Sequence, residues 1–284
     1  MAAIFPSVQV ADPAPQTPRY GMLGVATPID LPEHAVAGGV TYRTVVTDLP
    51  EGFDVTCSRS VVTFKDPCGD WITGTPFLVQ ANLTEGSIGD TATPDQVRAA
   101  LLARLFAGEQ PIVEQIFADG LVGASPSLAN NTPNATTLGA SVGLVDAFGA
   151  LEAWIYARQG PRAVLHVPLQ LAARCQYLNL VSQDPARTWR TALGTAVVFG
   201  NYSGNAPAGG APAAGTLNLY VSGSLSVWRE PDSQVFVTPY PGFLEPHTNQ
   251  VYAYARRGYV VTHNGLLAAT AATIRGCECE DLPA

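Results

Sequence analysis

The stretch DWITGTPFLVQANLTEGSIGDTATPDQVRAALLARLFAGEQPIVEQIFADG, residues 70–120, decides the fold. Its first part, residues 72–81, is predicted to be an apolar strand, and a loop rich in Gly, Thr and Asp follows. A long helix then has an unusually clear start, because Thr93 is a good N-cap, Pro94 suits the first helical position and Gln96 completes a capping box. The stretch contains no catalytic motif, and we interpret it as the organising element of the fold.

One apolar stripe runs along this helix, which we expect over residues 94–119. Its members recur at helical spacing: they are Val97, Ala100, Leu101, Ala103, Leu105, Ile112, Val113, Ile116 and Phe117. Pro111 is predicted to kink or restart the helix, because it has no N–H and its ring clashes with the preceding turn. Gly120 is a plausible end.

The stripe is predicted to cover one face of a C-terminal β-sheet. Alternating residues of that sheet need such a cover, and they are Tyr252, Tyr254, Val260 and Leu266. The opposite face of the helix is then expected to carry Arg98, Arg104 and Glu109.

The composition is low in charge. Of 284 residues, 47% are hydrophobic and only 13% are charged, whereas a typical soluble domain has about 25% charged residues. One interpretation is that copies of the same chain cover much of the exterior. The other is a large core encoded by a GC-rich genome that favours Ala, Gly and Pro.

The charged residues exclude several functions. Lys65 is the single lysine, and it does not follow a Gly-rich turn, so the sequence has no phosphate-binding P-loop. The net charge of −8 argues against DNA binding through counterion release. The N-terminus does not look like a secretory signal, and no apolar run reaches the roughly 20 residues that span a bilayer. We expect a protein made in a cytoplasm, without a membrane partner.

The five cysteines do not predict a metal site. They are Cys57, Cys68, Cys175, Cys277 and Cys279. An odd number in a reducing compartment indicates free thiols. The Cys-X-Cys pair near the C-terminus has no second ligand pair, whereas a structural zinc site needs four ligands.

The order of the predicted elements indicates an α+β fold. Residues 1–40 read as an extended arm, and residues 40–46 and 61–64 as the strands of a protruding hairpin. After the long helix come a second helix at residues 144–158, short strands, and a Gly/Ala/Pro-rich loop at residues 203–215. That loop is predicted to be mobile because it has no large side chain to anchor it. The remainder reads as strands.

A hydrolase motif is present, but the strand that should precede it is not predicted. Residues 139–143 match the Gly-X-Ser-X-Gly elbow around Ser141, and Asp184 and then His247 or His263 follow in the right order. The elbow requires a buried strand immediately before it, whereas here a polar loop precedes it. We interpret Ser141 as the N-cap of the second helix and His166, within AVLHVP, as a core residue. No catalytic residue and no cofactor is predicted.

The element order resembles the major capsid proteins of tailed bacteriophages, whose Hong Kong 97-like fold is shared with encapsulin shells. The resemblance covers most of the chain. Residues 1–40 look like the N-terminal arm, 41–80 like the extended E-loop, and 141–220 like the axial domain. Residues 81–140 and 221–284 resemble the peripheral domain, which includes the spine helix (94–119, with AGEQPIVEQIF) and the strands SGSLSVWREPDSQVFVTP and NQVYAYARRGYVVTHNGLL.

The resemblance implies a shell subunit rather than an enzyme. Many copies would form pentamers and hexamers around phage DNA, without sequence-specific DNA binding and with decoration or scaffolding proteins as further partners. The protein would be assembled in the bacterial host cytoplasm and reside in the virion. Inter-subunit contacts are expected at Ile4, Phe5, Lys65, Arg98, Arg104 and Glu109. In some members a lysine of the E-loop forms a crosslink, for which Lys65 is the candidate here.

Two alternatives stay open. The first is an encapsulin-type shell around enzyme cargo, which would need a groove for a cargo peptide. The second is an α/β-hydrolase that uses Ser141.

Overall fold

The computed structural model describes residues 20–45, 68–84, 93–130, 135–158, 163–238, 243–245 and 250–274. They form a mixed α+β fold, as predicted, with a six-stranded sheet, a seven-stranded sheet and a two-stranded hairpin. The predicted contacts at Ile4, Phe5 and Lys65 lie outside these residues, as do the second hairpin strand expected at 61–64 and Cys57, Cys277 and Cys279.

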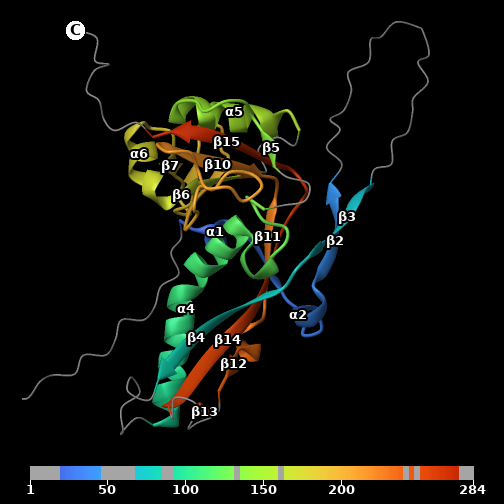
Figure 1. The fold of residues 1–284 in the computed structure, drawn as a ribbon, viewed down its shortest axis with the longest axis vertical. Coiled ribbons are helices and arrows are strands. Elements are labelled where there is room, and N and C mark those ends of the chain that lie inside the picture. The colour runs from blue at the N-terminus through green and yellow to red at the C-terminus, as the bar shows by residue number, and fades with distance from the viewer. Residues whose placement is uncertain are drawn as a thin grey trace, which may run out of the picture.

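The six-stranded sheet is built around one long strand, β14 (Gln250–His263). Its other strands are β1 (Thr27–Asp30), β4 (Phe77–Thr84), β11 (Leu225–Arg229), β12 (Phe236–Val237) and β13 (Phe243–Glu245). β4, β11, β12 and β13 all pair antiparallel with β14, and β1 pairs parallel with β11. The long helix α4 (Pro94–Asp119) lies along β4 and β14 (Figure 1).

The predicted cover of the C-terminal sheet by the helix is confirmed, but the predicted sheet face was wrong. Leu101 and Leu105 share one core with Ala255 and Tyr259, which are odd-numbered positions of β14. Val260 points to the other face, where it packs with Leu31 and its neighbours. Both faces of β14 carry apolar residues, so alternation alone does not identify the face that meets the helix.

Helix α4 begins as predicted. The Gln96 amide donates to Thr93 Oγ1 (3.3 Å), and the Thr93 amide donates to Gln96 Oε1 (2.8 Å), which together form a capping box. The helix continues through Pro111 to Asp119 without the predicted restart, and Gly120 ends it at φ 64°. Two predicted stripe members, Ala100 and Ile112, are exposed.

The seven-stranded sheet forms the second core (Figure 1). Its order is β5 (Thr136–Thr137), β15 (Leu267–Thr273), β10 (Thr216–Ser222), β6 (Val164–Pro168), β9 (Ala196–Gly200), β8 (Trp189–Arg190) and β7 (Ser182–Gln183). The helix α5 (Leu144–Tyr156) contacts β10 and β15 and buries Phe148, Leu151 and Ile155 in this core. The short helix α6 (Ala172–Tyr177) contributes Cys175. The 3₁₀ turns of the fold are η1 (Leu121–Gly123), η2 (Leu169–Leu171) and η3 (Asp232–Gln234).

The strand expected at residues 72–81 is two strands. β3 (Cys68–Gly74) pairs antiparallel with β2 (Val40–Val45) in the hairpin, and β4 joins the main sheet. The break falls at Thr75 and Pro76. Pro76 lacks a ladder donor, and the Thr75 amide donates to Ser125 O (2.7 Å) outside either ladder.

The second half of the predicted arm is part of the subunit. After the short helix α1 (Met22–Val25) and β1, the helix α2 (Ala35–Gly38) leads into the hairpin. Met22 and Leu31 are 0% and 1% exposed. These side chains are buried against their own chain, so residues 20–40 are not an arm that lacks partners within the fold.

The Gly/Ala/Pro-rich loop has anchors that its composition does not reveal. Asn205 Nδ2 donates to Asp119 Oδ1 (3.0 Å), and Ser203 also bonds to Asp119 at the end of α4. The Gly209 amide donates to Ala129 O (3.0 Å). The loop is therefore tied to α4 by its polar side chains, contrary to the predicted lack of anchoring.

Candidate functional site

Ser141 is not the predicted helix cap, and among the described residues it has no hydrogen bond to a histidine. The N-cap of α5 is Gly143, and Ser141 Oγ instead bonds to Thr273 Oγ1 (2.8 Å). Asp184 is held by Thr188 and Arg190, and these hydrogen bonds, that of the Thr188 hydroxyl foremost, lower the pKa of the Asp184 carboxyl to about 2.

None of the three described histidines, His34, His166 and His263, hydrogen-bonds to Ser141 or Asp184. His166 is buried, as predicted, and its ring nitrogens bond to Tyr202 OH (3.1 Å) and Ser222 Oγ (2.8 Å). His263 Nδ1 accepts from the Gly265 amide (3.1 Å), and its Nε2 has no hydrogen-bond partner among the described residues. Burial lowers the pKa of His166 to about 3 and that of His263 to about 4. His247 lies outside the described residues.

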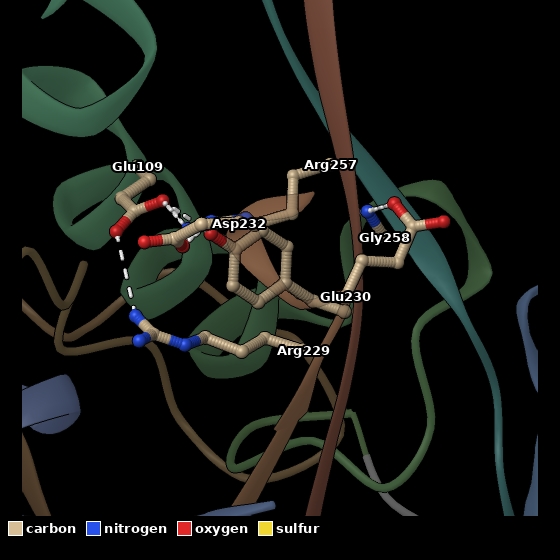
Figure 2. A network of polar contacts seen from close by, with 7 residues as sticks. Glu109, Arg229, Glu230, Asp232, Arg257 and Gly258 are labelled. Carbon is tan, nitrogen blue, oxygen red and sulfur yellow. Dashed lines mark hydrogen bonds and ion pairs between the residues drawn. The ribbon is translucent and has the colours of Figure 1, made fainter. Parts of the chain in front are cut away.

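The most extensive polar site joins α4 to the six-stranded sheet (Figure 2). Arg257 Nη1 donates to Glu109 Oε2 (3.0 Å), and Arg257 Nη2 contacts the Asp232 carboxylate. The Tyr259 hydroxyl donates to the same Glu109 oxygen (2.5 Å). Arg229 lies 3.9 Å from Glu109 Oε1.

Because this network of Glu109, Arg257, Tyr259 and Asp232 is buried around Glu109, it fixes α4 against the sheet, and we call it the lock. The side chains of Arg257 and Glu109 are 1% and 3% exposed, and desolvation is repaid only when both charges are paired and hydrogen-bonded. Desolvation first, and then the Glu109 carboxylate, raise the pKa of Tyr259, so this hydroxyl stays a neutral donor. The lock joins the helix to adjacent strands of the sheet.

Glu109 is therefore not a surface residue, which corrects its predicted place among the inter-subunit contacts. The positions 97, 101, 105, 109, 113 and 117 are spaced by four, so Glu109 occupies the row of buried apolar residues on the helix face that meets the sheet. A charged residue can occupy this buried row because Arg257 supplies a buried cation to pair with it. The other two predicted contacts on the helix, Arg98 and Arg104, are exposed.

A second buried carboxylate, Glu114, was missed by the sequence analysis. It is 3% exposed, its Oε1 accepts from the Met22 amide (2.8 Å), and its Oε2 accepts from the Asn201 amide (2.9 Å). Desolvation raises the pKa of Glu114 to about 7, although both amide bonds act in the opposite direction. A carboxylate between apolar helix neighbours is the signal that would have found it.

The face of the six-stranded sheet that points away from α4 carries a partly exposed aromatic cluster. Arg256 lies over the Phe236 ring (5.0 Å), and the rings of Phe236 and Tyr254 are 5.5 Å apart. On the hairpin, Arg43 lies over the Trp71 ring (4.7 Å), and Trp71 is 62% exposed. These surfaces are suited to contacts with other chains because they combine apolar area with a cation.

We also searched the described residues for metal-binding groups, reactive thiols and membrane-spanning helices. They contain no group of three or more His, Cys, Asp or Glu that would hold a metal ion. Burial raises the pKa of the Cys175 thiol to about 12. Among these residues, none of the helices has both the length and the apolar character for crossing a bilayer.

Comparison with known proteins identifies the fold. No protein-family model and no curated protein sequence matches the chain. Among solved structures, the capsid of an empty GTA particle is similar over 95% of both chains, with a TM-score of 0.52 and 13% identity. The SrpI encapsulin of Synechococcus elongatus PCC 7942 is similar over 95% of this chain and 94% of its own, with a TM-score of 0.51 and 11% identity. The chain therefore has the capsid fold that its sequence resembles, which these two shell proteins share.

Proposed function

We propose that this protein is a structural shell subunit that self-assembles into the icosahedral capsid enclosing phage DNA. The observation that carries the proposal is the fold shared with the GTA capsid over 95% of both chains. The same similarity favours a structural role over catalysis. Residence in the virion and assembly in the host cytoplasm are parts of this proposal.

The surface chemistry supports multi-copy assembly. Only 13% of the residues are charged, and aromatic or large aliphatic side chains such as Trp71, Tyr156 and Tyr177 are more than half exposed in the single subunit. Exposed apolar side chains of this size are typical of surfaces that other protein chains cover. We further propose the division into arm, E-loop, peripheral and axial domains, with inter-subunit contacts at Ile4, Phe5, Lys65, Arg98 and Arg104 and decoration or scaffolding proteins as further partners.

The encapsulin-type shell is the second candidate, and the similarity to the SrpI encapsulin supports it about equally. The two candidates differ in their contents, which are DNA or an enzyme. They also differ in their expected gene neighbours, which are terminase, portal and protease genes for a phage and a ferritin-like cargo gene for an encapsulin.

The test is expression of the full chain followed by sedimentation and negative-stain microscopy. Pentamers, hexamers or closed shells support the proposal, whereas small monodisperse particles contradict it. The variants Arg98→Ala and Arg104→Ala should fold and weaken assembly, because both side chains are exposed on α4. Asp95→Asn, at an exposed position of the same helix, is the matched control.

A further inference from the structure

We propose that β4 of one subunit pairs antiparallel with β4 of a second copy across a two-fold axis, which joins the two six-stranded sheets edge to edge. β4 lies at an edge of its sheet, because β14 is the one strand with which it pairs. Among the described residues, no backbone hydrogen bond joins the other edge of β4 to a further segment. Unpaired amides and carbonyls at a sheet edge form a template for another strand. The inference does not depend on the proposed function.

The β4 strand is long and regular. Its eight residues pair with residues 252–259 without a bulge or a register shift. Its sequence, FLVQANLT, contains neither a charged residue nor a proline, and these are the residue types that keep a further strand away from an edge. Leu78 at this edge is 47% exposed. The edge of β4 is therefore suited to strand pairing.

The other sheet edges within the described residues are protected. The outer strands β5, β7 and β12 have two residues each, and β13 has three. β1 has four residues and contains Pro28 and Asp30. The hairpin strands β2 and β3 contain Arg43 and Asp70, and their ladder has an irregularity. Short strands, prolines, charges and bulges are the devices by which natural proteins prevent edge pairing, so their lack in β4 indicates an edge that is used.

The chemistry of β4 points to a second β4 as its partner. Among the described strands, β4 is the only one of this length that offers a free and uncharged edge, so it is the best match that a second copy presents. A two-fold axis perpendicular to the sheet places both α4 helices on one side of the joined sheet. Residues of the same sheet face then lie opposite one another across the new pair.

One register matches the side chains of the two strands. When Ala81 of both copies lies at the axis, Gln80 of each copy is opposite Asn82 of the other, and Val79 is opposite Leu83. Both amides are exposed and already bond to each other within one strand, from Gln80 Nε2 to Asn82 Oδ1 (2.6 Å). Each amide has further donors and acceptors for the facing amide. A register centred on Gln80 would instead place Leu78 opposite an amide.

The pairing closes at two copies. A two-fold contact uses the same surface of both partners, so the free edge of each β4 is consumed and no equivalent edge remains. The exposed face of β4 adjoins the cluster of Phe236, Tyr254 and Arg256, because Asn82 pairs with Tyr254 and Gln80 with Arg256. The dimer therefore carries two aromatic clusters on either side of an uncharged central strip.

Sedimentation velocity of the full chain, over a range of concentrations, measures the association. The double variant Gln80→Lys with Asn82→Lys places lysines opposite each other in both pairs and should raise the dissociation constant of the dimer about tenfold or more. Circular dichroism should show that it folds, because both positions are exposed. Thr27→Lys, at an exposed position on the opposite edge of the same sheet, is the matched control and should associate like the wild type.

A charge-swap experiment separates strand pairing from damage to the subunit. The double variant Gln80→Glu with Asn82→Glu should also associate weakly, but an equimolar mixture of the lysine and glutamate variants should associate at least as well as the wild type. In that mixture every lysine faces a glutamate. Failure of the mixture to associate, or undiminished association of both charged variants alone, would overturn the pairing.

Amide hydrogen exchange identifies the occupant of the edge. The β4 amides that point away from β14 should become protected as the wild type associates. A monomeric wild type would overturn the pairing, and protected β4 amides in that monomer would show that another segment of the same chain covers the edge. Dimers that form no shell contradict the proposed shell function alone, whereas shells that the lysine variant forms as readily as the wild type contradict the β4 pairing alone.

Discussion

Arg257 and Glu109 are 148 residues apart in the sequence and form a buried ion pair with a 3.0 Å contact. The pair joins the C-terminal half of the long helix to the central strand of its sheet. Arg257 also contacts the Asp232 carboxylate, and Arg229 lies 3.9 Å from Glu109, but among the described residues Arg257 is the only buried cation that hydrogen-bonds to Glu109. The stability of the subunit is therefore expected to be sensitive to either side chain.

Arg257→Met should lower the free energy of unfolding by about 3–5 kcal/mol, because Glu109 is left buried without its cation. Urea unfolding followed by circular dichroism measures the loss. Arg256→Met is the matched control, since Arg256 lies on the other face over Phe236, and it should cost less than about 1 kcal/mol. Equal losses for the two variants would contradict the lock. Adding Glu109→Leu to Arg257→Met should restore part of the stability, since no buried charge then remains.

Leu101→Asp should abolish soluble protein. Leu101 is 0% exposed in the core between α4 and the sheet, and a carboxylate there has no cation to pair with. Arg104→Ala, one turn away on the exposed side of the helix, should leave the subunit folded. Expression trials with fractionation of soluble protein compare the two variants, and soluble, folded Leu101→Asp would show that the helix does not pack as described.

Two N-terminal truncations should differ sharply in whether the subunit folds. Removal of residues 2–19 should leave the folding of the subunit intact, because Met22 and its bond to Glu114 are retained. Removal of residues 2–31 also deletes β1 and the buried Met22 and Leu31, so we expect insoluble or unfolded protein. Thermal unfolding distinguishes the two proteins. A well-folded longer truncation would mean that residues 20–31 are only an arm, as the sequence first indicated.

Acid should destabilise the subunit through His166. Its pKa is about 3 in the folded protein and 6.5 in an ordinary environment, so the unfolded chain binds the extra proton. The neutral ring therefore contributes stability that is fully present above pH 6.5 and is lost as the pH falls toward 3. His166→Gln lacks this loss, so the stability gap between wild type and variant should narrow by roughly 1 kcal/mol per pH unit below 6.5. A gap that is constant from pH 7 to pH 4 would contradict this assignment.

The sequence predicted the features that depend on local chemistry. The start of α4 was identified correctly because Thr93 and Gln96 cap the helix within four residues. His166 was recognised as a core residue from its apolar neighbours. The loop at 203–215 was misjudged because its anchor, Asp119, lies far away in the sequence.

The errors about Glu109 and about the face of β14 arose because the partners of these residues lie in distant segments of the sequence. Glu109 is charged, so it was assigned to the surface, although its spacing of four from Leu105 and Val113 placed it in the buried row. Only knowledge of Arg257 would have resolved that conflict. In the same way, Val260 and Tyr259 are both fully buried, and nothing local to β14 shows which of them meets the helix.

The position of β14 in the sequence keeps α4 without its complete sheet until residues 250–263 have been synthesised. α4 is synthesised early, but the sheet that covers it is organised around a strand near the C-terminus, with Tyr259 150 residues after Glu109. At ribosomal speeds this separation is roughly ten to thirty seconds, during which the apolar row of α4 has no sheet to pack against. A chain that ends before β14 lacks the strand to which β4, β11, β12 and β13 all pair, so it cannot form the native six-stranded sheet.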